Sequence, residues 1–119
     1  MITVKANVLL CQNDDYKFWG LDFAKKHGFS KESVEVDYKK VYEESFRFYT
    51  NPTKDQKLEI LEQIFEKLNV HHPQGYNNRS LSVSDIVCFE QDGDKEYWYC
   101  DRFGWSEVEG PIDPQFLNV

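Results

Sequence analysis

The segment KDQKLEILEQIFEKL, residues 54–68, carries the clearest structural signal in the chain and decides its fold class. Its apolar side chains recur at helical spacing, at Leu58, Leu61, Ile64, Phe65 and Leu68. Residues three and four apart lie on one face of an α-helix, so the charged residues cover the opposite face. Thr53 followed by Gln56 fits a capping box, in which each side chain satisfies a free backbone donor. The pattern predicts an amphipathic helix over residues 54–68.

Strand patterns precede this helix. Residues 2–11 are apolar and β-prone, and predict a first strand. Residues 18–27 predict a short helix capped by Gly28, because glycine adopts the left-handed conformation at little cost. Residues 34–42 alternate between apolar and polar side chains, which predicts a second strand. The alternation shifts phase at residues 39–40, which indicates a bulge or bend there.

A β-meander follows the helix. Residues 84–91 and 95–101 predict two strands, and Asp92-Gly93 between them suits a type I′ turn, which needs positive φ at both central residues. A turn ending at Gly104 leads into a short strand over residues 105–108.

We therefore expect one α+β domain over residues 1–119. Its small antiparallel sheet is expected to be strongly bent, with closure into a barrel as an alternative, and to end in the β-meander. The one long amphipathic helix packs on this sheet. Prolines at 111 and 114 predict that the tail, with Phe116-Leu117, docks as a turn.

The composition is that of a folded, acidic protein. Of 119 residues, 40% are hydrophobic and 16% aromatic, and 21 acidic against 14 basic residues leave a net charge of −7. Scattered basic residues make direct binding of nucleic acid unfavourable. A basic protein surface is the more natural partner, and a second alternative is that the protein itself mimics the negative charge of DNA. The simplest interpretation is that the charge serves only solubility.

The cysteines indicate a reducing compartment. Cys11, Cys88 and Cys100 are odd in number, widely spaced and apolar in context, so we expect reduced thiols in a cytoplasmic protein. No charged leader precedes an apolar stretch at the N-terminus, and no apolar run reaches the length of a membrane span. No metal or other cofactor is expected, and the oligomeric state is left open.

Catalytic motifs are absent from the sequence. It contains no glycine-rich phosphate loop, serine elbow, HExxH or EF-hand spacing, so we expect a protein that is not an enzyme. The alternative is a small metal-dependent or cysteine-dependent hydrolase. Such an enzyme would use Cys100, Asp101, His71 or His72.

Two stretches are candidates for recognition. In residues 79–87, RSLSVSDIV, small hydroxyl residues alternate with larger ones, which suits either a peptide-binding edge or a structural corner. We favour the corner, with Arg79 paired to a carboxylate such as Asp101. Tyr97-Trp98-Tyr99 places rings on both faces of one strand, and we favour their burial over an exposed patch. The candidate protein-binding residues are Arg79, Trp98, Asp101, Arg102 and Trp105.

Several of these stretches resemble the YodL-like family. The resemblance is strong over residues 58–108 and weaker over residues 1–50, and it rests on the runs LEQIFEKLN (61–69), HP (72–73), RSLSVSDIV (79–87) and YCDRFGW (99–105). Cys100 stands where the family usually has valine, Trp105 where it has phenylalanine, and Glu44 where glycine is common.

The resemblance implies a protein of a mobile genetic element (a plasmid, conjugative element or phage) of gram-positive bacteria. It brings no established catalytic residues. Together with the negative charge, it leads us to expect a non-enzymatic protein-interaction module with an unidentified protein partner. Countering host defence, as an anti-restriction or anti-CRISPR protein, is one version of this role.

Overall fold

Eight secondary-structure elements build the fold in the computed structural model, which describes residues 1–108. In chain order they are β1 (Ile2–Cys11), α1 (Leu21–Lys26), α2 (Ser33–Asp37), β2 (Tyr38–Phe48), α3 (Lys54–Asn69), β3 (Ile86–Gln91), β4 (Asp94–Asp101) and β5 (Gly104–Val108). The structure confirms the predicted α+β class. The turn predicted for the tail around Phe116-Leu117 lies outside the described residues.

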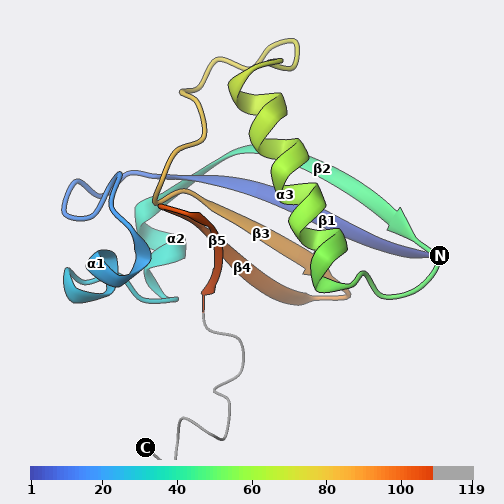
Figure 1. Ribbon diagram of the computed structural model, residues 1–119, viewed down its shortest axis with the longest axis horizontal. Helices are drawn as coiled ribbons and strands as arrows, with labels where there is room; N and C mark the ends of the chain where they lie inside the picture. The colour runs from blue at the N-terminus through green and yellow to red at the C-terminus, as the bar shows by residue number, and fades with distance from the viewer. Residues whose placement is uncertain (109–119) are drawn as a thin grey trace, which may run out of the picture.

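The strands form one antiparallel sheet in the order β2-β1-β3-β4-β5 (Figure 1). The meander β3-β4-β5 occupies one side of the sheet, and β1 joins it to β2. Within residues 1–108, β2 and β5 are the two edges and do not pair with each other, so the sheet is open. The barrel alternative is therefore wrong.

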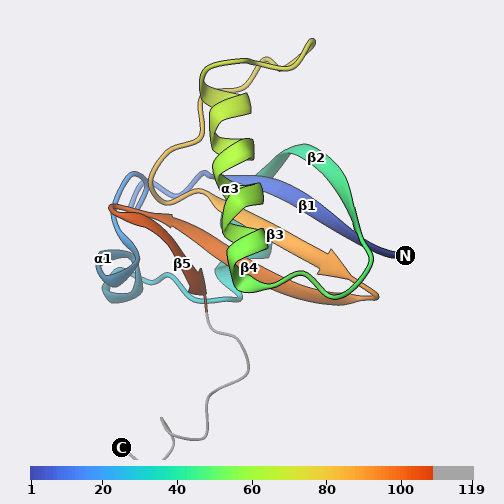
Figure 2. The same cartoon turned by 45° about the vertical axis from the view of Figure 1, so that its right-hand side comes forward.

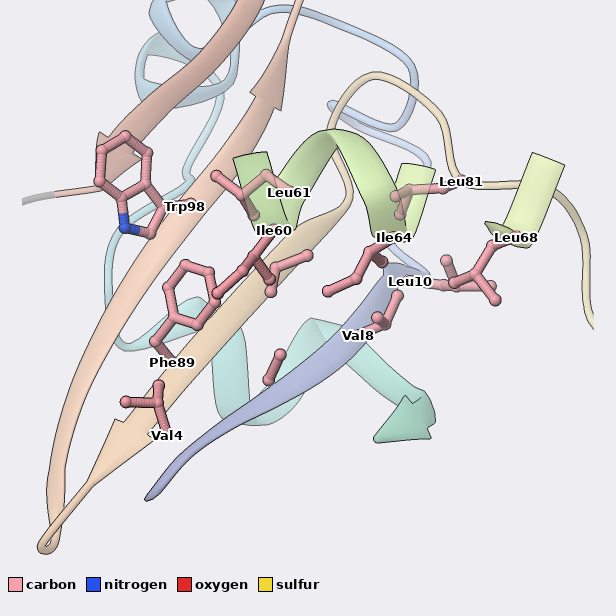
Figure 3. Packing of buried hydrophobic residues seen from close by; sticks show 12 residues of the cluster. Val4, Val8, Leu10, Ile60, Leu61, Ile64, Leu68, Leu81, Phe89 and Trp98 are labelled. Atoms are coloured by element: carbon pink, nitrogen blue, oxygen red, sulfur yellow. The ribbon is translucent and has the colours of Figure 1, made fainter. Parts of the chain in front are cut away.

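α3 covers one face of the sheet (Figures 1 and 2). Its buried side chains, Ile60, Leu61, Ile64 and Leu68, pack against apolar residues that β1, β3 and β4 direct to this face (Figure 3). The predicted capping box is present: Thr53 Oγ1 accepts from the backbone N–H of Gln56, and Gln56 Oε1 accepts from that of Thr53. None of the helices within residues 1–108 has the length and apolar content needed to cross a bilayer.

The opposite face of the sheet is covered by the segment between β1 and β2. A second apolar cluster there joins Tyr16, Leu21 and Phe29 of this segment to Tyr97 and Tyr99 of β4. Trp98, between those tyrosines, points to the α3 side. Both faces of the central strands are thus buried, which accounts for the three consecutive aromatic residues.

Residues 34–37 are the main departure from the predicted elements. They form α2 instead of the start of a strand, and β2 begins at Tyr38. In this single helical turn the Val34 side chain is buried, with 5% of its surface exposed, whereas Val36 faces solvent and is 83% exposed. In a strand both side chains would have faced the same side of the sheet.

The predicted irregularity in β2 is present one residue further along. Val8 pairs with Tyr42 and Leu9 with Lys40, so Val41 is the extra residue of a bulge. At the β3–β4 hairpin, Asp92 (φ 50°) and Gly93 (φ 85°) adopt the left-handed conformations that the type I′ turn requires.

Candidate protein-binding groove

The RSLSVSDIV motif forms a corner organised by one buried carboxylate. Asp85 is fully buried, and its two oxygens accept 2.7 Å hydrogen bonds from Nη1 and Nη2 of Arg79. They also accept from the backbone N–H groups of Cys11 at 2.8 Å and Ser82 at 2.7 Å. The bidentate pairing raises the pKa of Arg79. The prediction that Arg79 pairs with a carboxylate is confirmed, but its partner is Asp85; the suggestion of Asp101 was wrong.

The neighbouring Ser84 ties this corner to the rest of the fold. It adopts a positive φ of 86°, and its hydroxyl accepts a 2.9 Å hydrogen bond from the backbone N–H of Phe18. Its backbone N–H donates to the carbonyl of Cys100, while the Cys100 N–H donates to the carbonyl of Asp85. The motif therefore joins the end of β1, the end of β4 and the loop before α1, as expected of a structural corner.

Asp101 organises the adjoining turn between β4 and β5. Its Oδ1 accepts from the backbone N–H groups of Leu21 at 3.2 Å and Arg102 at 2.8 Å, and its Oδ2 accepts from the Ser106 hydroxyl at 2.9 Å. A side chain at Gly20 would place its Cβ 2.9 Å from Asp101 Oδ1. Glycine at position 20 therefore permits the close approach of the loop before α1 to this turn.

A groove of about 540 Å³ opens between α3, the corner and the β4–β5 turn. We call it the aromatic groove. Figure 2 shows β5 next to α3. The groove is lined by Phe18, Glu62, Phe65, Leu81, Ser82, Val83, Cys100, Asp101, Arg102, Gly104 and Trp105.

Three of the five predicted binding residues, Asp101, Arg102 and Trp105, line this groove. Arg79 lies behind it, with its guanidinium 5.2 Å from the centre of the Phe18 ring. Trp98 is only 2% exposed, and its indole N–H donates to Glu96 Oε1 at 2.6 Å. The structure thus bears out the favoured burial of Trp98, and this residue is removed from the candidate surface.

Of three exposed aromatic rings around the groove, Phe18 and Trp19 were missed by sequence reasoning. Phe18 is 55% exposed, Trp19 50% and Phe103 95%. Trp19 stacks on Phe23 with ring centroids 4.2 Å apart. One signal in the sequence could have indicated this exposure. Phe18-Trp19 follows the turn-forming residues 12–15 and precedes a helix that is too short to bury both rings. Aromatic and arginine side chains together are typical of protein-binding surfaces.

The cysteines are buried thiols. Burial raises the pKa of Cys88 to about 11 and that of Cys100, in the groove wall, to about 12. Such thiols are protonated at neutral pH and are poor nucleophiles. Within residues 1–108, no three His, Cys, Asp or Glu side chains gather in a way that could hold a metal ion.

Comparison with known proteins places the chain in a family. No curated protein and no solved structure matches it. The sequence model of the YodL-like domain, in contrast, matches residues 4–110, which include the corner, the groove lining and every described strand but the first residues of β1. The chain therefore belongs to the YodL-like domain family.

Proposed function

We propose that the protein is a non-enzymatic module that binds another protein through the aromatic groove. The observation that carries this proposal is the open groove itself, where Phe65 and Trp105 are partly exposed beside Arg102 and the buried Leu81 forms part of the wall. The exposed ring of Phe18 lines it, and the exposed Phe103 stands in the chain between the lining residues Arg102 and Gly104. A monomeric protein rarely leaves such an aromatic surface without a partner.

The cellular setting is part of the same proposal. We propose that the protein acts in the cytoplasm as a product of a mobile genetic element, and that its partner belongs to the host. The partner would then be a component of host defence that the protein blocks by occupying a binding surface. The net charge of −7 supports a protein partner over nucleic acid.

A cysteine-dependent hydrolase is the weaker alternative. Cys100 is the thiol of the groove, but its pKa of about 12 leaves almost no thiolate at neutral pH. No neighbouring base in the described residues lowers this value; nearby carboxylates, including Asp85, raise it further.

The test is affinity purification from a lysate of the host with matched surface variants. Wild type, Phe18→Ala and Phe103→Ala are compared with Tyr49→Ala, which removes another exposed ring (88%) that does not line the groove. We expect wild type and Tyr49→Ala to retain the same protein, identified by mass spectrometry, and the two groove variants to lose it. Equal retention by all four proteins would contradict the proposal, as would the absence of any retained protein.

A further inference from the structure

Four carboxylates form a stripe along the exposed side of α3. Asp55, Glu59, Glu62 and Glu66 follow one another at intervals of four, three and four residues, and all four are exposed. At 3.6 residues per turn, this spacing places them on one face of the helix. We call these four residues the acidic stripe.

Helix stability accounts for Asp55, in the first turn, where the helix dipole favours a carboxylate, but not for Glu59, Glu62 and Glu66. Like charges four residues apart destabilise a helix. Among the described residues, the only ion-pair partner of the stripe is His71, whose Nε2 lies 3.8 Å from Glu66 at an exposed position. The helix lysines Lys57 and Lys67 pair elsewhere, with Glu96 and Glu44. The stripe therefore presents uncompensated negative charge to solvent.

The acidic stripe borders the aromatic groove. Glu62 lines the groove together with Phe65, and it also lines a more open depression with Asp55, Leu58 and Glu59. The half-buried apolar side chains of Leu58 and Phe65 lie on the helix flank between the stripe and the buried face. The surface is thus an apolar channel with one acidic wall.

We propose that the occupant of this channel is a basic segment of a partner protein. The segment places apolar side chains in the aromatic groove and Lys or Arg side chains against Glu59 and Glu62. Opposite charge along the wall of an apolar groove steers association and selects the partner. The same carboxylates repel a phosphate backbone, which makes nucleic acid the wrong occupant. This inference rests on the proposed function and specifies the chemistry of its partner.

The test selects random displayed peptides of about 12 residues on the immobilised protein, long enough to cross a groove of this size. We expect the enriched peptides to combine several Lys or Arg residues with at least one large apolar residue. Each selected peptide is then synthesised beside a twin in which Glu replaces every Lys and Arg. The twin should bind at least about tenfold more weakly.

Charge reversal on the protein provides the matched comparison. Two double variants are compared, Glu59→Lys/Glu62→Lys in the acidic stripe and Glu32→Lys/Glu35→Lys as the control. Both raise the net charge equally. The control residues lie at and just before α2, which packs on the opposite face of the sheet. We expect the first pair to weaken binding of the selected peptide at least about tenfold and the second to leave it nearly unchanged. A lysine at position 59 would follow Asp55 and one at position 62 would precede Glu66, so the helix itself should not be weakened.

The outcomes separate this inference from the proposed function. In one outcome, the selected peptides are neutral or acidic and bind wild type and Glu59→Lys/Glu62→Lys equally, but do not bind Phe18→Ala. This result would overturn the inference of a basic partner segment and would leave the groove as a binding site. A dimer in light scattering that Phe18→Ala dissociates would replace the basic partner with a second copy of the chain. Failure to enrich any peptide on wild type over Phe18→Ala would overturn both proposals.

Discussion

Replacing Asp85 with Asn should severely destabilise the protein. Each carboxylate oxygen of Asp85 accepts two hydrogen bonds: Oδ1 from Cys11 N and Arg79 Nη2, and Oδ2 from Ser82 N and Arg79 Nη1. An asparagine side chain has nearly the same shape but carries an NH₂ group in place of one oxygen. Whichever way the amide turns, this NH₂ group faces two N–H donors.

The magnitude follows from the burial of the pair. Asp85 is fully buried and the Arg79 side chain is 28% exposed, so the substitution leaves a largely buried guanidinium without its counter-charge. Removing one partner of such a pair costs about 3–5 kcal/mol. That is a large fraction of the roughly 5–15 kcal/mol that holds a typical domain folded.

The assay is urea denaturation at neutral pH, followed by tryptophan fluorescence. Asp101→Asn is the control, because Asp101 is only partly buried and accepts three hydrogen bonds, one fewer than Asp85. We expect that control to lose about 1 kcal/mol of unfolding free energy. If Asp85→Asn lost no more than this control, with an unchanged dependence on urea, the corner would not depend on the buried charge and our reasoning would be refuted.

Two further predictions concern the helix cap and the thiols. Thr53→Ala removes the side-chain oxygen that accepts from the backbone N–H of Gln56. In the same urea assay, this substitution should lower the free energy of unfolding by about 1 kcal/mol. An unchanged urea midpoint would show that the cap does not stabilise the protein. Burial raises the pKa of Cys88 and Cys100 from the ordinary value of 9.0 to about 11 and about 12. A raised pKa in the folded state gives stability that is complete below pH 9 and is lost as the pH rises through the folded values, so the urea midpoint should fall steadily above pH 9. A midpoint that stays constant to pH 11 would contradict this burial effect.

The candidate site was only partly predictable from the sequence. Asp101, Arg102 and Trp105 lie within one turn, so their proximity follows from the predicted hairpin, and the structure places all three in the groove wall. Trp98 is of the same residue type as Trp105, but its position in β4 directs it under α3. Phe18 reaches the groove only because the loop before α1 is held by Ser84, 66 residues further along the chain.

Elements with local signals could be predicted from the amino-acid sequence alone. The apolar spacing of residues 54–68, the capping pair Thr53 and Gln56, and the Asp92-Gly93 turn each depend on residues within a few positions of one another. Backbone geometry then leaves one favourable structure for each pattern. These are the parts of the fold that the predictions reproduced most closely.

Which side chains meet and which remain exposed depends on how the elements pack, and the sequence patterns did not reveal it. From the sequence, several carboxylates were possible partners of Arg79. Arg79 pairs with Asp85 because β1 ends where the backbone N–H of Cys11, 74 residues away in sequence, donates to the same carboxylate. The aromatic groove likewise exists because α3, the corner and the β4–β5 turn meet without filling the space between them. Such contacts depend on how the elements pack, and no local pattern of residues encodes that packing.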